Sequence, residues 1–242
     1  MRTAWVLALC LTAGSVRAGG LEIAWDEGLA FDFDKAHYQQ LLEQIVSRSL
    51  DQAEAGTGLK LEHGLKINVY TRVRYEKEFG SEAAHTQGAH YFRGAIYVNG
   101  GSQLDLRFGG AMTHEMSHAM LDAKGNGKNF PTWFNEGLAE TLNWSQMGLP
   151  DLATPQAQEL KTARQNGTLV PLLQRGPMNP FRYLQSHGAV LFLKKKYGPE
   201  KLLQLIKATA EGAPFEQSLH QATSSSTPEV EKDFGDWVDH LL

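Results

Sequence analysis

The sequence predicts an α+β fold in which a small N-terminal lobe of sheet and helix packs on a mainly helical C-terminal lobe. Residues 65–70 (LKINVY) alternate apolar and polar side chains, as in a strand with one buried face. From Gln103 onward, apolar residues recur instead with helical spacing. A chain of 242 residues can bury one good core or two lobes that flank a cleft. We therefore expect a single domain over residues 19–242, with lobes at 19–102 and 103–242.

The first residues have the composition of a secretory signal peptide. Arg2 supplies a positive charge, residues 4–13 are almost wholly apolar, and Val16-Arg17-Ala18 resembles a cleavage site of the small-x-small type. The alternative is an N-terminal membrane anchor, but the apolar run is too short to cross a bilayer core of about 30 Å. We expect residues 1–18 to be removed and the protein to be secreted or periplasmic.

Cysteine content and charge exclude several classes of function. Cys10 is the only cysteine and lies in the predicted signal peptide, so the mature chain would have neither disulfides nor thiol catalysis. Loss of Arg2 and Arg17 would leave 21 basic residues against 27 acidic ones, a formal net charge of about −6. An acidic chain without a basic block is a poor partner for nucleic acid or an anionic membrane. The oligomeric state is left open.

The elements of the N-terminal lobe follow from local signals. Asp34 can cap a helix that ends by Gly56 or Gly58. Its apolar residues recur at close to 3.6-residue spacing: Tyr38, Leu41, Leu42, Ile45, Val46 and Leu50. A second strand is expected over residues 95–98, after the Gly-rich segment GAHYFRG. Residues 19–32 lack clear periodicity and are expected to form an extended lead-in.

Helix-start signals recur through the C-terminal lobe. One helix should carry the segment THEMSHAM and end around residues 125–127, and another should open at Pro131. Three more starts pair a capping residue with a following proline, at Thr154-Pro155, Asn179-Pro180 and Thr227-Pro228. Residues 189–193 are apolar on all sides, so the helix over residues 180–197 should be deeply buried.

Two histidines and a glutamate suggest a zinc site between the lobes. His114 and His118 lie four residues apart, so a helix presents both on one face and their ring nitrogens can bind one ion. A catalytic zinc site has three protein ligands and one open position. Glu136 on the next helix suits the third place, because the flexible segment at residues 124–130 (KGNGKNF) lets that helix fold back across the first.

Glu115 has the position of a general base. Zinc lowers the pKa of a water from 15.7 toward about 7, and Glu115 would take the proton as that water attacks a carbonyl group. As the neighbour of His114, Glu115 points around the helix and reaches the water rather than the metal. The non-catalytic interpretation is an amphipathic helix with two solvent-facing histidines.

HEMSH followed by PTWFNEGLAE resembles the gluzincin zinc metallopeptidases, and most closely the short peptidase MA-like family, in which a HExxH helix precedes a Trp-x-x-Glu-Gly segment. This resemblance implies one Zn²⁺ per chain, bound by His114, His118 and Glu136, with Glu115 as general base. It also implies that Glu140 is a carboxylate that supports the first metal histidine, as metal-bound imidazoles require. The alternative for Glu140 is an ordinary acid on a helix surface.

The resemblance further implies a side chain that stabilises the oxyanion. Tyr183 is the nearest counterpart of the catalytic tyrosine of aminopeptidase-type gluzincins, although the glycine found three residues after that tyrosine lies five residues on here, at Gly188. His187, one helical turn further, is the second candidate, because other gluzincins use a histidine. Either residue can also simply be packed in its helix.

The sequence lacks the Gly-Ala-Met-Glu-Asn segment by which aminopeptidases hold a free amino terminus. We therefore expect a zinc-dependent metallopeptidase that acts on a peptide or protein substrate without aminopeptidase specificity. The strand over residues 95–98 is either the edge that binds an extended peptide or an ordinary sheet strand. The competing hypothesis is a non-catalytic binding or scaffold protein that keeps the peptidase fold and the metal. A purely structural zinc site is less favoured, since such sites usually have four protein ligands.

Overall fold

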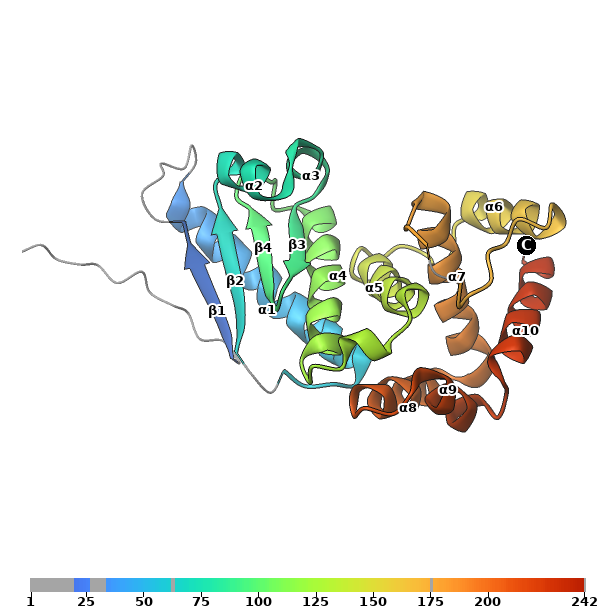
Figure 1. Ribbon diagram of the computed structural model, residues 1–242. Helices are drawn as coiled ribbons and strands as arrows, with labels where there is room; N and C mark the ends of the chain where they lie inside the picture. Colours follow the sequence, from blue (N-terminus) through green and yellow to red (C-terminus); the bar gives the residue numbers. More distant parts are fainter. Residues whose placement is uncertain (1–19, 27–33, 62–63, 175, 242) are drawn as a thin grey trace, which may run out of the picture.

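The computed structural model describes residues 20–26, 34–61, 64–174 and 176–241. A four-stranded sheet with helices lies at one end of the molecule, and a group of helices forms the other (Figure 1). The predicted α+β class is therefore confirmed. The predicted signal peptide lies outside the described residues. Among the described residues, no helix combines the length and apolar content that a membrane crossing requires.

The sheet has the order β1-β2-β4-β3. Its strands are β1 (Leu21–Trp25), β2 (Leu65–Tyr70), β3 (Ala89–Phe92) and β4 (Ala95–Asn99). β2 pairs in parallel with both β1 and β4, whereas β3 runs antiparallel to β4 and forms one edge. One face of the sheet is apolar, with Ile67, Val69, Ile96 and Val98 completely buried in the core.

Two of the four strands depart from the sequence prediction. β1 lies in the segment expected to be an extended lead-in, and pairing with β2 makes it a strand of the sheet. β3 lies within the Gly-rich segment before β4, and Arg93 and Gly94, both with positive φ, form a tight hairpin between them. As a consequence β4 lies between β2 and β3, so the suggestion that residues 95–98 form the free edge is wrong. On this side of the sheet the edge strand is β3.

Helix α1 (Lys35–Thr57) begins and ends as predicted. The Asp34 carboxylate accepts hydrogen bonds from the first turn, and Gly58 ends the helix in the left-handed conformation. Short helices α2 (Arg72–Phe79) and α3 (Ser81–Thr86) connect β2 to β3 and lack a strong sequence signal. In Figure 1, α1 crosses behind the sheet and α4 (Leu106–Asp122) runs beside β3, where it contacts both β3 and β4.

The helical lobe continues from α4 through a short 3₁₀ turn, η1 (Gly127–Asn129). It contains α5 (Thr132–Gln146), α6 (Thr154–Gln165), α7 (Pro180–Tyr197), α8 (Pro199–Ala210), α9 (Phe215–Thr223) and α10 (Thr227–Asp239). Asn179 caps α7 as predicted. In α6 and α10 the threonine is already the first helical residue, and the cap lies one position earlier, at Ala153 and Ser226.

Helix α5 packs between α4 and α7 and contacts both of them. It therefore sets how these two helices lie relative to each other. Gly137 permits the close crossing with α7, because a Cβ atom there would lie only 2.2 Å from the carbonyl oxygen of Ser186. Residues 189–193 of α7 are all buried, in agreement with their apolar pattern. The crossing fixes which part of α7 reaches the cleft.

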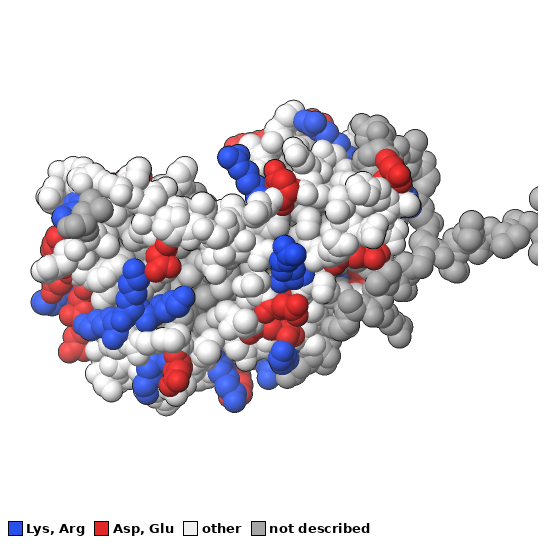
Figure 2. Space-filling view, turned by 180° about the vertical axis from the view of Figure 1, so that it is seen from behind, with Lys and Arg blue, Asp and Glu red and all other residues white. Residues whose placement is uncertain are grey.

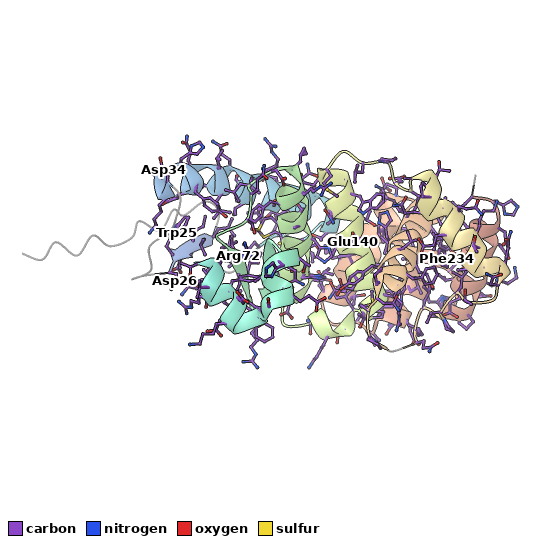
Figure 3. The ribbon with its side chains drawn as sticks, turned by 90° about the horizontal axis from the view of Figure 1, so that it is seen from above. Trp25, Asp26, Asp34, Arg72, Glu140 and Phe234 are labelled. Carbon is purple, nitrogen blue, oxygen red and sulfur yellow. The ribbon has the colours of Figure 1, made fainter. Side chains whose placement is uncertain are left out.

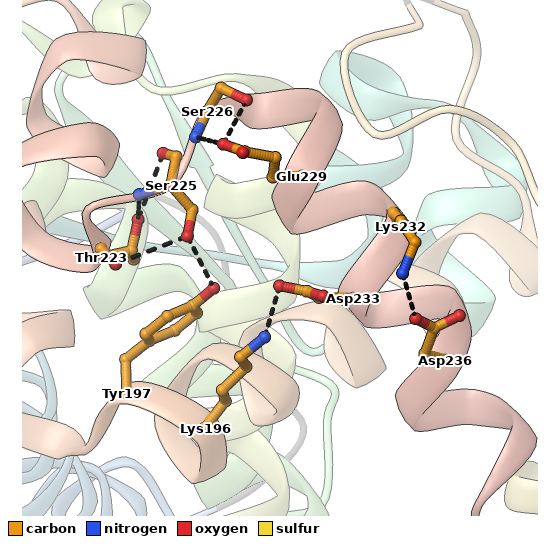
Figure 4. A network of polar contacts seen from close by, with 9 residues as sticks. All are labelled: Lys196, Tyr197, Thr223, Ser225, Ser226, Glu229, Lys232, Asp233 and Asp236. Carbon is orange, nitrogen blue, oxygen red and sulfur yellow. Dashed lines mark hydrogen bonds and ion pairs between the residues drawn. The ribbon is translucent and has the colours of Figure 1, made fainter.

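Helix α10 packs Val230, Phe234 and Val238 into the core, and polar contacts lie on its exposed side. Ser226 and Glu229 form a capping box at the start of α10, in which the Ser226 N–H donates to Glu229 Oε2 at 2.7 Å. Ion pairs join Lys232 to Asp236 and Lys196 to Asp233 (Figure 4). Basic and acidic side chains are interspersed over the back of the molecule (Figure 2). Such exposed pairs each contribute little to stability, on the order of 0–1 kcal/mol.

Candidate metal centre

The two motif histidines lie together on one side of α4 and are largely buried. Asp105 caps this helix by accepting hydrogen bonds from the N–H groups of Arg107 and Phe108. The opposite side of α4 is buried, with Met112 and Met116 in the core. The four-residue spacing brings the rings of His114 and His118 to a centroid separation of 4.7 Å. Burial of the apolar side thus turns both imidazoles toward α5.

Glu136 approaches both histidines from α5. Its Oε2 atom lies 3.5 Å from Nε2 of His114 and 3.6 Å from Nε2 of His118. The three possible ligand atoms all lie within 4.8 Å of one another. Ligands at 2.0–2.2 Å from a tetrahedral zinc are separated by roughly 3.3–3.6 Å. Both nitrogen–oxygen distances match this separation, so the group of two nitrogens and one carboxylate oxygen suits a tetrahedral metal ion such as zinc.

Each histidine has a partner on its other ring nitrogen. Nδ1 of His114 lies 3.1 Å from Oε1 of Glu140, and Nδ1 of His118 lies 2.7 Å from Oδ1 of Asn135. A proton on each Nδ1, donated to these oxygens, leaves each Nε2 lone pair free for a metal. Glu140 therefore has the contact that the resemblance implied, and Figure 3 shows it where α4 and α5 meet.

Sequence reasoning missed Asn135. A signal was present, because a metal-bound histidine needs an oxygen partner and Asn135 immediately precedes the candidate ligand Glu136 on the same segment. However, its role depends on the side chain pointing back to His118 from the first turn of α5. Only the packing of α5 against α4 determines that direction.

The electrostatics of the cluster favour a bound cation. Burial opposes a charge on His114, but contacts with Glu136 and Glu140 outweigh it and raise the pKa of His114 to about 10. Burial likewise opposes ionisation of Glu136, yet the two histidines hold its pKa at about 2. The pKa of Glu140 is also lowered, against the effect of its burial, mainly by His114. A positive charge beside these carboxylates is therefore strongly stabilised. A metal ion can supply that charge in place of the proton.

Glu115 lies beside this cluster and is bonded to the sheet. Its Oε2 atom accepts a hydrogen bond of 2.7 Å from the backbone N–H of Tyr91 on β3. The hydroxyl of Tyr91 in turn donates to Asp122 at 2.8 Å, one turn beyond His118. The edge strand therefore holds the Glu115 carboxylate in place beside the histidines.

One cleft of about 610 Å³ contains all of these groups. Its lining includes the three candidate ligands together with Glu115, Asn135, Glu140, Tyr91 and Tyr183. Residues of β3 form one wall, α4 and α5 form the floor, and Tyr183 comes from α7. The residues of α9 and α10 are not part of this lining.

Comparison with known proteins places the chain in a family. The profile of the peptidase MA superfamily matches residues 46–240, which include the sheet from β2 onward and the whole metal centre. The chain belongs to the peptidase MA superfamily. Members of this superfamily are typically metal-dependent, in agreement with the donor group of His114, His118 and Glu136.

One curated relative of this peptidase MA chain is the protein named Uncharacterized protein YhcO of Bacillus subtilis (strain 168). The two sequences are 30% identical over 130 residues, which is 51% of this chain and 39% of the relative. The matched region is thus well under half of the relative's length.

The two candidates for the oxyanion site have different environments in the peptidase MA fold. Tyr183 is half-buried in the cleft, and burial, followed by the charges of Glu136, Glu140 and Glu115, raises its pKa to about 12. His187 is buried outside the cleft, where Nε2 donates to the Asp151 carbonyl at 2.6 Å and Nδ1 lies 3.3 Å from Thr141 Oγ1. Burial lowers the pKa of His187. Of the two residues, Tyr183 alone faces the metal centre.

Proposed function

We propose that the chain is a zinc-dependent metallopeptidase that hydrolyses peptide bonds with Glu115 as general base. The main support for this proposal is the position of Glu136. Its Oε2 atom lies 3.5 Å from Nε2 of His114 and 3.6 Å from Nε2 of His118, in the cleft that also contains Glu115. Three ligands with an open fourth position are typical of catalytic rather than structural zinc.

Glu115 has the geometry that a general base requires. When bound, zinc supplies a Lewis acid that polarises a carbonyl group and lowers the pKa of a water molecule. The Tyr91 N–H fixes Oε2 of Glu115, which leaves Oε1 to accept the proton of that water. Glu115 can later deliver this proton to the nitrogen of the leaving amine. Because the carboxylate is held by backbone, its position does not depend on a mobile side chain.

The free edge of β3 supports the binding of an extended peptide. The carbonyl of Gly88 accepts a hydrogen bond from Asn99 N, so residues 88, 90 and 92 direct their backbone polar groups toward β4. Ala89 and Tyr91 direct theirs to the open edge. Since Glu115 occupies the Tyr91 N–H, the Ala89 N–H and the carbonyls of Ala89 and Tyr91 are left for a substrate backbone.

Tyr183 is the candidate for stabilising the oxyanion. Its hydroxyl has no hydrogen-bond partner among the residues that the structure describes, and its raised pKa keeps it protonated as a donor at neutral pH. His187 lacks both access to the cleft and a free ring nitrogen. We therefore assign the donor role to Tyr183.

The test combines zinc content with hydrolysis. The purified protein should contain about one zinc per chain and should cleave members of a diverse peptide library. Glu115→Gln should retain zinc and lose hydrolysis, whereas the matched control Glu159→Gln, on the exposed side of α6, should change neither. A protein that neither contains nor takes up zinc would refute the proposal. Stable peptide binding by the zinc-loaded protein without cleavage would support the non-catalytic scaffold instead.

We also propose that the mature protein begins after Ala18 and is secreted or periplasmic, on the basis of the N-terminal composition. Expression of the full chain, followed by mass spectrometry of the intact protein outside the cytoplasm, tests this. Recovery of a chain that retains residues 1–18 would contradict it.

A further inference from the structure

A second, smaller pocket continues from the metal cleft at the end where β3 begins. Its volume is about 330 Å³. It shares the residues Thr86, Gln87, Gly88 and Ala111 with the lining of the metal cleft. The two hollows are therefore adjacent, and the smaller one forms an end pocket beside the metal centre.

Two arginines make the end pocket cationic. Arg72 lines it from the first turn of α2, and Arg107 lines it from the first turn of α4. Among the described residues, neither guanidinium has a hydrogen-bond or ion-pair partner, whereas nearby Arg74 is bound to Asp26. The acidic residue of the lining is Asp105, whose Oδ1 already caps α4. The end pocket thus has two guanidinium groups against the single carboxylate of Asp105, and this excess of positive charge suits a carboxylate ligand.

The backbone around Arg72 keeps its side chain at the pocket. A Cβ atom at Gly101 would lie 3.3 Å from Cβ and 3.4 Å from Cδ of Arg72, so the chain passes closely along the aliphatic part of this side chain. Figure 3 shows Arg72 at the start of α2, on the lobe that carries the sheet. Arg72 is therefore supported along its stem while its charged end remains without a partner.

The direction of β3 indicates which side of the scissile bond would lie near this pocket. A peptide that adds to β3 in antiparallel orientation, as β4 does on the other side, has its C-terminal part near Gly88 and its N-terminal part near Phe92. From Tyr91, which holds Glu115, to Gly88 is three strand positions, or roughly 10 Å. The end pocket would then receive a group two or three residues beyond the bond that is cleaved.

We propose that Arg72 and Arg107 bind a carboxylate on the C-terminal side of the scissile bond. The carboxylate is either the C-terminus of a short peptide or the side chain of an acidic residue. This inference rests on the proposed function, since it concerns the substrate of the same cleft. It makes the enzyme selective for carboxylate-bearing peptides.

Binding of hydroxamates to the zinc-loaded protein tests this selectivity without turnover. A zinc-chelating succinyl hydroxamate linked to Leu-Ala is prepared with a free C-terminal carboxylate and as the C-terminal amide. A second pair, linked to Leu-Glu-amide and Leu-Gln-amide, offers the charge on a side chain. Dissociation constants are measured by calorimetry. We expect the charged member of at least one pair to bind about tenfold more tightly, and the pair that responds identifies the source of the carboxylate.

Variants of the two arginines test whether the preference for the charged hydroxamates arises in the end pocket. In the double variant Arg72→Gln/Arg107→Gln the preference should fall to about onefold, while the neutral members bind as before. The control Arg93→Gln removes one positive charge at the opposite end of β3 and should keep the preference. Equal binding of charged and neutral members in the wild-type protein would overturn the inference. So would a preference that survives the double variant or that is lost in Arg93→Gln, and so would weaker binding of the neutral members by the double variant.

These outcomes separate the inference from the proposed function. If the hydroxamates bind tightly without any preference, the carboxylate site is wrong and the zinc peptidase stands. If the preference is present and depends on the two arginines but no peptide is cleaved, the carboxylate site stands and the catalytic proposal fails. A protein that does not bind zinc would refute both.

Discussion

Three helices around the cleft each carry a pair of candidate residues four positions apart. The pairs differ in how many of their members face the cleft. On α4, both His114 and His118 face the metal centre. On α5, Glu136 meets both histidines and Glu140 meets His114. On α7, Tyr183 lines the cleft, while His187 is bonded to the Asp151 carbonyl away from it. The same spacing thus puts both members into the site on two helices and one member on the third.

The difference follows from how the helices cross. Helix α5 runs along α4, so successive turns of the two helices remain in contact and both acids reach the histidines. Helix α7 crosses α5 closely at Gly137 and Ser186, immediately before His187. His187 is consequently packed against Trp144 and Thr141 of α5, and only the turn before the crossing reaches the cleft. The spacing of residues along a helix determines which of them share one face. The point at which two helices cross determines which residues of that face reach the cleft.

Loss of the ligand that α5 supplies should have the largest effect. Glu136→Gln removes the charge that faces both histidines, and we expect zinc affinity to fall by more than the roughly 10–100-fold associated with outer partners. Hydrolysis should be lost with the metal. Zinc titration against a competing chelator measures this. Retention of tight zinc binding would show that α4 forms the site without α5.

Glu115→Gln should abolish hydrolysis through the proton transfer alone. The amide oxygen can still accept the Tyr91 N–H, so the contact between α4 and β3 is kept while the base is removed. We expect kcat to fall by about 10²–10⁴-fold with unchanged zinc content. Steady-state kinetics and metal analysis on the same sample test this. A kcat within a fewfold of wild type would exclude Glu115 as the base.

The partners of the two histidines should contribute to a similar degree. Asn135→Ala and Glu140→Ala each remove the acceptor of one Nδ1 proton. Each should weaken zinc binding by about 10–100-fold, because the imidazole loses its fixed orientation. Competition with a chelator gives both affinities. If neither variant weakens zinc binding, packing alone orients the imidazoles.

Tyr183→Phe should lower kcat while zinc affinity and KM change little. The phenol faces the cleft without a partner, and loss of one oxyanion donor costs about 10²–10³-fold in kcat. We expect the lower end of this range, because the side chain is only half-buried. A change confined to KM would instead indicate that Tyr183 binds substrate.

His187→Ala should have the smallest effect on hydrolysis and a clear effect on stability. It leaves a cavity and removes the donor to the Asp151 carbonyl, at a cost of about 2–4 kcal/mol in the free energy of unfolding. The kcat/KM of the folded variant should stay within about twofold of wild type. Urea denaturation and kinetics at low temperature measure the two quantities. A large loss of kcat without loss of stability would give His187 a role in the chemistry.

The sequence alone was sufficient for the parts of the protein governed by neighbours along the chain. The four-residue spacing of His114 and His118 and the following segment with Glu136 predict the group that could hold a metal, because a helix presents such residues on one side. The ends of α1 follow from Asp34 and Gly58 for the same local reason.

Tertiary structure alone decided the relations between distant segments. The sequence does not show that β3 rather than β4 forms the free edge, since strand order depends on pairing between segments and the Arg93-Gly94 turn is a weak hairpin signal. The choice of Tyr183 over His187 depends on the crossing of α5 and α7. The meeting of Arg72 and Arg107, from different helices, depends on the packing of the lobe that carries the sheet. The spacing of residues along the chain determines which of them share one face of a single helix. A cleft is formed by several elements together, so its lining depends on how those elements pack.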